Sequence, residues 1–209
     1  MDHKTKLLNV LLFSMLMISV AFAASAGASQ DKTLDNLIAA FNGESNAHAK
    51  YLAYAVKADE EGYGKVASLF RAAAAAEQIH LNNHAKVITA MGGTAKADIK
   101  AAPVKSTKEN LEDALKGENY ERLTMYPEFI GQAQKENKTD AVRTFTYAKD
   151  AETEHAKLYQ AALDNMKAWK LPKTDFYVCP TCGYTVEGKP AFTACPVCRT
   201  PAKLYKNVN

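Results

Sequence analysis

Two E-x-x-H sequences carry the most informative chemistry in the chain: Glu77-Gln78-Ile79-His80 and Glu152-Thr153-Glu154-His155. Residues three apart lie on one face of a helix, so each sequence places a carboxylate beside an imidazole. Glu44 and Glu118-Asn119-Tyr120-Glu121 supply further carboxylates on two other stretches. When a bundle takes one E-x-x-H pair from each of two helices and a Glu from each of the other two, its core holds a carboxylate-bridged di-iron or di-manganese site. We therefore predict a dinuclear metal site.

Four amphipathic helices are needed to bring these residues together, and the sequence predicts four. Apolar residues recur every three or four positions in each of four segments. The first two run from Thr33 to about Asp59 and from about Lys65 to Met91. The third begins at a capping box, Ser106-Thr107-Lys108-Glu109, and continues through Phe129, and the fourth begins at a cap, Thr139 or Asp140, and ends at Leu171-Pro172. Residues 94–105 carry no period and predict a long crossover between the second and third helices. The predicted fold is therefore mainly α, a ferritin-like four-helix bundle. Pro127 lies inside the third helix and should bend it or open one backbone hydrogen bond.

The position of the acidic residues on apolar stripes distinguishes this site from an ordinary charged helix surface. A single E-x-x-H is weak evidence, because helices rich in Glu are common and their charges usually face solvent. Here the carboxylates fall on the apolar faces, where burying them together would be costly without compensating cations. Glu121 is one carboxylate more than the minimal site needs, and it could exchange with a histidine when the metal changes oxidation state. The predicted ligands are Glu44, Glu77, His80, Glu118, Glu121, Glu152 and His155.

Two further histidines lie on the same stripes. His48 follows Glu44 by one turn, and His84 follows His80 by one turn. For both we expect packing in the core, or contact with a ligand, rather than a bond to the metal.

All four cysteines lie near the C-terminus, as Cys179-Pro180-Thr181-Cys182 and Cys195-Pro196-Val197-Cys198. Two C-x-x-C knuckles at this separation are typical of four thiolates that hold one metal ion. Two disulfides are the alternative in an exported protein. We predict a small metal-knuckle domain at residues 174–209, after a bundle domain at residues 31–168.

The first residues of the chain predict export. Two lysines precede an apolar run, Leu7–Val20, and small residues follow it. This order is typical of a secretory signal peptide, and we predict cleavage after Ala23, or alternatively Ala26, so that residues 1–23 are removed. An uncleaved anchor is the other interpretation, because the segment is about as long as a marginal transmembrane helix. After cleavage we expect a periplasmic protein without stable membrane association.

Charge and composition bound the remaining possibilities. The formal net charge is +3 and the lysines are scattered, which gives no reason to expect a nucleic acid as partner. An apolar content of 47% over 209 residues is enough for one medium core and a small second domain.

The motifs together resemble the rubrerythrin family from about Leu34 to Leu204. The C-terminal knuckles, with Cys182-Gly183-Tyr184, resemble a rubredoxin, in which four thiolates hold one iron and pass single electrons. A zinc ribbon would use the same four ligands. The stretches of the bundle that carry the resemblance are Phe41-Asn42-Gly43-Glu44-Ser45, Ala76-Glu77-Gln78-Ile79-His80, Gly117-Glu118-Asn119-Tyr120-Glu121, Met125-Tyr126-Pro127, and Ala151-Glu152 with His155.

The resemblance implies a role for each predicted ligand. It implies that Glu77 and Glu152 bridge two irons, and that His80 replaces Glu121 on one of them upon reduction. It also implies that Tyr126 and Tyr51 lie near the irons, either as proton donors or as orienting residues; ordinary packing is the alternative. The remaining ligands would divide between the irons, Glu44 with Glu121, and Glu118 with His155.

The activity implied by the resemblance is reduction of hydrogen peroxide to water, a defence against oxidative stress, with electrons relayed through the rubredoxin-like iron site. It also implies a homodimer in which the rubredoxin of one subunit lies near the di-iron site of the other. Export is a departure, because rubrerythrins are usually cytoplasmic and are ultimately supplied from a nicotinamide cofactor. The sequence has no dinucleotide-binding motif. We therefore expect a periplasmic electron donor, such as a cytochrome or a quinol-linked carrier.

Three alternatives stay open at this point. The same bundle could be a ferroxidase or iron-handling protein that oxidises Fe(II) with oxygen. It could be a non-catalytic electron carrier or metal-binding module. It could also hold zinc or manganese and perform no redox chemistry, because geometry alone does not secure iron.

Overall fold

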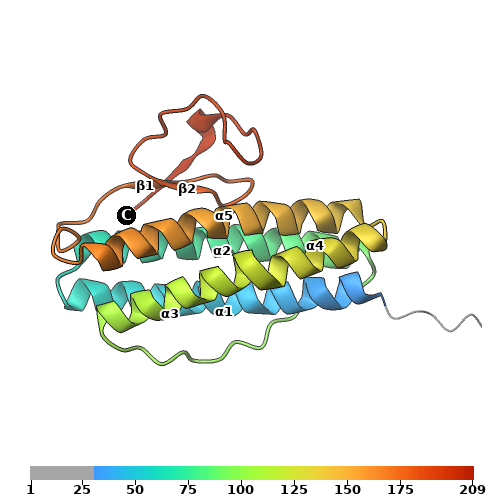
Figure 1. Ribbon diagram of the computed structural model, residues 1–209, viewed down its shortest axis with the longest axis horizontal. Helices are drawn as coiled ribbons and strands as arrows, with labels where there is room; N and C mark the ends of the chain where they lie inside the picture. The colour runs from blue at the N-terminus through green and yellow to red at the C-terminus, as the bar shows by residue number, and fades with distance from the viewer. Residues whose placement is uncertain (1–30) are drawn as a thin grey trace, which may run out of the picture. The chain divides into compact units, whose positions relative to one another are not determined.

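The computed structural model describes residues 31–209, which form one compact unit (Figure 1). The predicted signal peptide at residues 1–23 lies outside the described residues. The helices are α1 (Lys32–Glu60), α2 (Gly64–Ala90), α3 (Thr107–Tyr120), the π-helical turn η1 (Glu121–Met125), α4 (Tyr126–Lys135) and α5 (Thr139–Asp164). In Figure 1, α3, η1 and α4 form one continuous rod, which packs against α1 and α5. The four-helix bundle with its long crossover between α2 and α3 is confirmed.

Local sequence explains where the helices begin and end. The Asp31 carboxylate accepts a hydrogen bond from the Leu34 N–H and caps α1. Ser106 and Glu109 form the predicted capping box at the start of α3. Gly92, with a φ of +80°, follows α2 and turns the chain into the crossover.

The predicted limits of the last helix are wrong at both ends. No side chain caps α5, because Asp140 already lies in its first turn and its carboxylate accepts a hydrogen bond from Arg143. At the other end α5 stops at Asp164, well before Leu171-Pro172. Asn165 ends it, since its side-chain oxygen accepts the Ala168 N–H and competes with the helical backbone.

The sequence predicts that Pro127 bends the third helix or opens one of its backbone hydrogen bonds. The structure has instead the π-turn η1 just before this proline. A proline has no N–H to donate and its ring crowds the preceding turn. The Tyr126 N–H bonds to the Glu121 carbonyl, five residues back, so the turn before Pro127 is wider than an α-turn. Such π-turns are frequent at functional sites.

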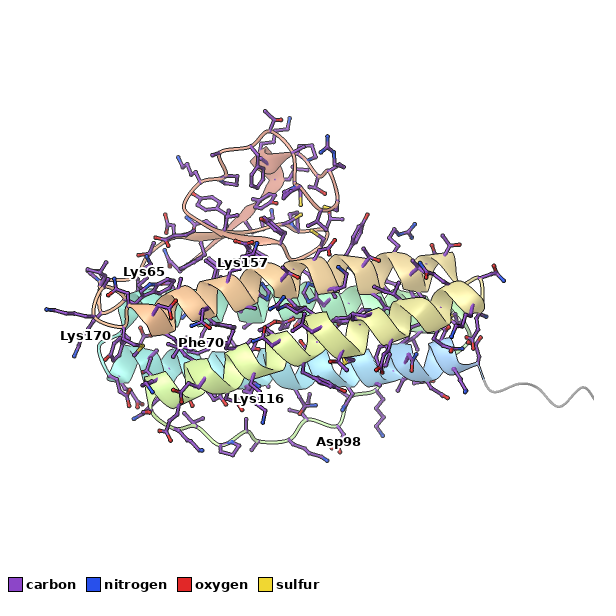
Figure 2. All side chains as sticks on the ribbon, in the orientation of Figure 1. Lys65, Phe70, Asp98, Lys116, Lys157 and Lys170 are labelled. Atoms are coloured by element: carbon purple, nitrogen blue, oxygen red, sulfur yellow. The ribbon has the colours of Figure 1, made fainter. Side chains whose placement is uncertain are left out.

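Two apolar clusters fill the bundle on either side of its polar middle. One contains the rings of Tyr51, Tyr54, Phe70 and Tyr159, and the other contains Phe145 and Tyr126. Figure 2 shows side chains filling the interior around Phe70, whereas Asp98 and Lys170 project from the surface. Within residues 31–209, no helix is both long enough and apolar enough to cross a membrane.

The C-terminal segment folds into a small antiparallel sheet with strand order β2-β1-β3. The strands are β1 (Phe176–Val178), β2 (Thr185–Glu187) and β3 (Lys206–Val208); Val178 pairs with Thr185 and with Lys206. Trp169, Phe176 and Val178 join the apolar cluster of the bundle, so the sheet packs on the helices rather than standing apart. The domain limits 31–168 and 174–209 stay predictions.

Candidate metal centres

The structure brings six of the seven predicted bundle ligands into two overlapping groups. In each group the potential ligand atoms lie within 4.8 Å of one another. They come from α1, α2, α3 and α5, and all six residues are buried. Glu77 and Glu152 belong to both groups, which is the position expected of bridging carboxylates. The groups are Glu44, Glu77, His80 and Glu152, and Glu77, Glu118, Glu152 and His155.

The unsatisfied polar atoms of this cluster fit two metal ions. Both oxygens of Glu152, one oxygen each of Glu44, Glu77 and Glu118, and the His155 Nδ1 make no hydrogen bond within the described residues. The His155 Nδ1 lies only 2.7 Å from a Glu152 oxygen, but the angle between the two groups does not suit a hydrogen bond. Buried carboxylates without partners are strongly unfavourable. Two divalent cations would balance the charge of four carboxylates, and iron accepts both oxygen and imidazole ligands.

The outer nitrogens of both histidines are held by the C-terminal segment. The His80 Nε2 lies 3.0 Å from the Cys182 carbonyl oxygen, and the His155 Nε2 lies 3.1 Å from the Thr185 hydroxyl. A carbonyl oxygen can only accept, so the His80 Nε2 carries a proton and its Nδ1 is left to face the carboxylates. Sequence reasoning missed both contacts, because they join residues 102 and 30 positions apart along the chain, beyond the reach of any local pattern.

Protons take the place of the cations in the metal-free chain. Burial lowers the pKa of His80 and His155, but the neighbouring carboxylates together outweigh burial and raise both well above the usual value: Glu152 acts on both, with Glu77 at His80 and Glu118 at His155. Burial, and then the charge of Glu152, raise the pKa of Glu118 to about 7. Metal binding must therefore release protons from this cluster.

Glu121 lies outside both ligand groups. It begins the π-turn η1 and is partly exposed, unlike the other carboxylates of the predicted set. Burial of its carboxyl, together with the charge of Glu44, raises its pKa well above the usual value. Its role as a ligand stays a prediction.

Two buried tyrosines donate hydrogen bonds to carboxylates of the cluster. The Tyr51 hydroxyl donates to a Glu118 oxygen at 2.6 Å, and the Tyr126 hydroxyl donates to a Glu44 oxygen. Burial, together with these neighbouring carboxylates, raises the pKa of both tyrosines well above the usual value. Both therefore stay protonated at neutral pH beside the predicted ligands.

The two additional histidines differ in their surroundings. The His84 Nε2 lies 3.2 Å from the Tyr126 hydroxyl, and its Nδ1 lies 3.0 Å from the Thr144 hydroxyl. Burial lowers the pKa of His84 and keeps it neutral. The His48 Nδ1 donates to the Ala74 carbonyl oxygen at 2.7 Å, a helix-to-helix contact. Neither residue belongs to a ligand group of the described chain.

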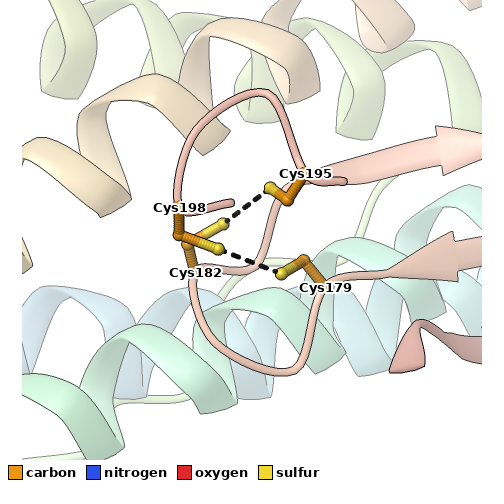
Figure 3. A group of neighbouring side chains, drawn as sticks. All are labelled: Cys179, Cys182, Cys195 and Cys198. Carbon is orange, nitrogen blue, oxygen red and sulfur yellow. Dashed lines mark hydrogen bonds between the residues drawn. The ribbon is translucent and has the colours of Figure 1, made fainter. Parts of the chain in front are cut away.

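The four cysteines converge on one point (Figure 3). The Cys179 and Cys198 sulfurs lie 3.5 Å apart, and the Cys182 and Cys195 sulfurs lie 3.6 Å apart. A tetrahedral site with metal–sulfur bonds of about 2.3 Å has sulfurs about 3.8 Å apart. None of the four forms a disulfide. The geometry therefore fits one metal ion, and we call residues 176–208 the four-cysteine module.

The two C-x-x-C knuckles have the same type of backbone turn, but only the first one requires a glycine in it. The Gly183 N–H bonds to the Cys179 carbonyl and the Arg199 N–H bonds to the Cys195 carbonyl, with φ values of +78° and +66°. Arg199 shows that the turn itself tolerates a side chain. A Cβ on Gly183, however, would lie 2.4 Å from the His80 Nε2. The glycine is therefore required by the close approach of the four-cysteine module to the bundle site.

Comparisons with known proteins agree with these centres. The family model described as Rubrerythrin matches residues 35–163. The chain is 44% identical to nigerythrin of Nitratidesulfovibrio vulgaris over 175 residues, which cover 83% of this chain and 85% of that protein. It is 37% identical to rubrerythrin-2 of Clostridium acetobutylicum, over 79% of this chain and 91% of that protein.

Solved structures give the same result for the fold. A mixed-valence structure of nigerythrin superposes with a TM-score of 0.78 at 40% identity, covering 84% of this chain and 86% of that one. A bacterioferritin of Mycobacterium tuberculosis superposes with a TM-score of 0.60 at 20% identity, covering 66% and 87%, and shows the ferritin-like fold alone. The chain therefore belongs to the rubrerythrin family, with a di-iron centre in a ferritin-like bundle and an iron site of four cysteines in its C-terminal module.

Proposed function

We propose that the protein is a non-haem di-iron peroxidase that reduces hydrogen peroxide to water. The observation that carries the proposal is the contact between the four-cysteine module and a predicted iron ligand, through the Cys182 carbonyl and the His80 Nε2. A site that only stores iron needs no contact through which a second metal centre can deliver electrons. The irons, when bound, supply two electrons to the O–O bond.

Two protons are needed as well, since H2O2 + 2 H⁺ + 2 e⁻ gives 2 H2O. Tyr51 and Tyr126 are placed to deliver them, because their hydroxyls are buried and donate to Glu118 and Glu44. His84 lies behind Tyr126 and Thr144 lies behind His84, so this side offers a chain along which a proton can be replaced. Of the two proton donors, Tyr126 is therefore the one linked to further polar groups, His84 and Thr144, that could replace its proton.

Electrons would arrive from the four-cysteine module one at a time. The bundle site must then pass through a half-reduced state in each cycle; a nigerythrin structure is described as a mixed-valence state. Glu121 would serve as the exchangeable ligand, since it lies just outside the ligand groups and can neutralise additional positive charge on oxidation. Crystal structures of the oxidised and reduced protein would test this exchange.

The distinguishing experiment compares oxidants on the fully reduced protein. We would purify the chain anaerobically, determine iron and zinc per chain, reduce it, and follow its absorbance after mixing with hydrogen peroxide or oxygen. Protein with zinc bound by the four cysteines is the matched control, because zinc has no redox chemistry. It should react with peroxide once and then fail to turn over. Faster reaction with oxygen than with peroxide would instead favour the ferroxidase.

We also propose that the protein is exported to the periplasm and receives electrons from a periplasmic cytochrome or similar carrier. The support is the signal-like sequence of residues 1–23. Periplasmic extract should sustain peroxide turnover. Turnover with a cytoplasmic reductase alone would contradict this assignment. N-terminal sequencing of the mature protein would test cleavage after Ala23.

The homodimer also stays a proposal. The resemblance implies that the four-cysteine module of one subunit serves the bundle of another. In the described chain, however, the module contacts its own bundle, at His80, at Lys65 through Glu187 (2.8 Å), and at Asn83 through the Thr181 carbonyl (2.9 Å). Within one chain, the four-cysteine module therefore contacts the bundle that holds the predicted di-iron site.

A further inference from the structure

Four aromatic rings lead from the di-iron ligands toward the outside of the bundle. Tyr51, Tyr54, Phe70 and Tyr159 are buried, and neighbouring ring centroids lie between 5.4 and 6.4 Å apart. Tyr51 is the innermost, because its hydroxyl donates to Glu118. Tyr54 lies one turn further along α1, 6.4 Å from Tyr51 between centroids. The cluster thus holds three oxidisable tyrosines packed around Phe70, and Tyr51 joins it to the predicted metal site.

Tyr54 differs from the other rings because its hydroxyl has a proton acceptor at the surface. The hydroxyl donates to the Asp113 carboxylate at 2.9 Å, within the distance for direct proton transfer. The Asp113 side chain is 52% exposed, and the Lys50 ammonium bonds to the same oxygen at 2.9 Å. Partial burial raises the pKa of Asp113, but the bonds from Lys50 and Tyr54 outweigh it and leave the pKa below its usual value. Asp113 is therefore ionised and able to accept a proton.

Lys50 also makes an electron transfer without a proton unfavourable. Its ammonium lies 5.3 Å from the centroid of Tyr51 and 5.9 Å from that of Tyr54. A tyrosine that lost only an electron would become a cation beside this charge, which the like charge opposes. At Tyr54 the proton can leave to Asp113, so the product is neutral. Tyr51 has no surface carboxylate that could take its proton, since its acceptor Glu118 is a predicted metal ligand.

We propose that Tyr54, with Asp113 as its proton acceptor, supplies the missing electron when hydrogen peroxide meets a half-reduced di-iron site. This inference rests on the proposed peroxidase function. Peroxide takes two electrons and two protons to give two waters, and both protons are delivered through Tyr51 and Tyr126 as in the proposed peroxidase reaction. One electron comes from the half-reduced site, and the other comes from Tyr54 through Tyr51. Tyr54–OH and Asp113–COO⁻ become a neutral tyrosyl radical and Asp113–COOH. An electron from the four-cysteine module, or from its donor, then restores both groups.

The test uses the full iron-loaded chain and a spectroscopic readout. Protein carrying one electron per di-iron site is mixed with one equivalent of hydrogen peroxide, frozen, and examined by electron paramagnetic resonance. We expect an organic radical whose spectrum narrows when the tyrosines are ring-deuterated. Tyr54→Phe should lose this signal, and Asp113→Asn, a change at an exposed position, should lose most of it.

Tyr159→Phe is the matched control. Tyr159 lies in the same ring cluster, 5.8 Å from Tyr51 between centroids, but its hydroxyl has no hydrogen-bond partner among the described residues. It should keep the radical. Persistence of the same tyrosyl signal in Tyr54→Phe would overturn the inference, as would a half-reduced protein that consumes peroxide without any radical. Failure of the fully reduced wild type to react with peroxide would instead refute the peroxidase itself.

Discussion

Replacing Gly183 by alanine should separate the four-cysteine module from the di-iron site while leaving both folded. The new Cβ would lie 2.4 Å from the His80 Nε2 and 3.2 Å from the Ala76 Cβ, whereas ordinary contacts begin at 3.4 Å. The module must therefore move by about 1 Å, and the bond from the His80 Nε2 to the Cys182 carbonyl, now 3.0 Å, would lengthen to about 4 Å, beyond hydrogen-bond range.

The energetic effect has two parts that can be measured separately. Forcing an extra methyl group into a packed contact costs about 1–3 kcal/mol, which is a roughly 5–150-fold shift from the docked to the undocked arrangement. An alanine at positive φ adds about 1–2 kcal/mol of backbone strain. Gly188 isolates this second part, because it has a φ of +70° and nothing lies within 4 Å of its hypothetical Cβ.

The assay follows the visible absorbance of the cysteine-bound iron during turnover. In wild type, this iron, once reduced, should be reoxidised promptly after peroxide has oxidised the bundle site. In Gly183→Ala this step should slow severalfold or more, while the first reaction of the fully reduced bundle with peroxide keeps its rate. Gly188→Ala should behave as wild type in both steps.

Equal rates of reoxidation of the cysteine-bound iron in Gly183→Ala and Gly188→Ala would refute the reasoning, provided that both variants keep the wild-type spectrum of that iron. Electrons would then reach the bundle without the contact at His80. A crystal structure of Gly183→Ala would show directly whether the module has moved.

Three other features of the chain can be tested directly. Mixing a Cys182→Ser chain with a Glu152→Ala chain should not restore peroxide turnover, because each chain's module contacts its own bundle; restored turnover would establish the homodimer with electron transfer between subunits. Glu136→Gln should remove an acid-sensitive contribution to stability. The Thr33 hydroxyl and N–H hydrogen bonds lower the pKa of Glu136 to about 2 from its ordinary 4.5, so the wild type's advantage in urea denaturation should be full above pH 4.5 and disappear as the pH falls toward 2. Removing the bundle metals while zinc stays bound to the four cysteines should lower the melting temperature, because four buried carboxylates lose their compensating cations; an unchanged melting curve would mean that protons compensate as well as metals do.

Local spacing in the sequence is enough to predict the fold class, the six bundle residues that the structure brings together and the group of four cysteines. The i, i+3 relation of Glu77 to His80 and of Glu152 to His155 needs only a helix to bring each pair onto one face. The C-x-x-C knuckles are similarly local, because each turn of backbone presents its own two sulfurs. Helix periodicity then places these residues in a core, where cations are needed to compensate the carboxylates.

The limits of sequence reasoning appear where long-range packing acts on these local units. Glu121 has the α-helical spacing of a ligand, but a π-turn begins at that residue and it lies outside both ligand groups, so its role as a ligand stays a prediction. The contact of Gly183 with His80 and the hydrogen bond of Tyr54 to Asp113 join elements far apart in the chain. No periodicity specifies such pairs, because they depend on how the four-cysteine module and α3 pack against α1 and α2. Spacing along the chain thus specifies which residues can bind metal, whereas the packing of distant elements specifies the routes by which electrons and protons can reach them.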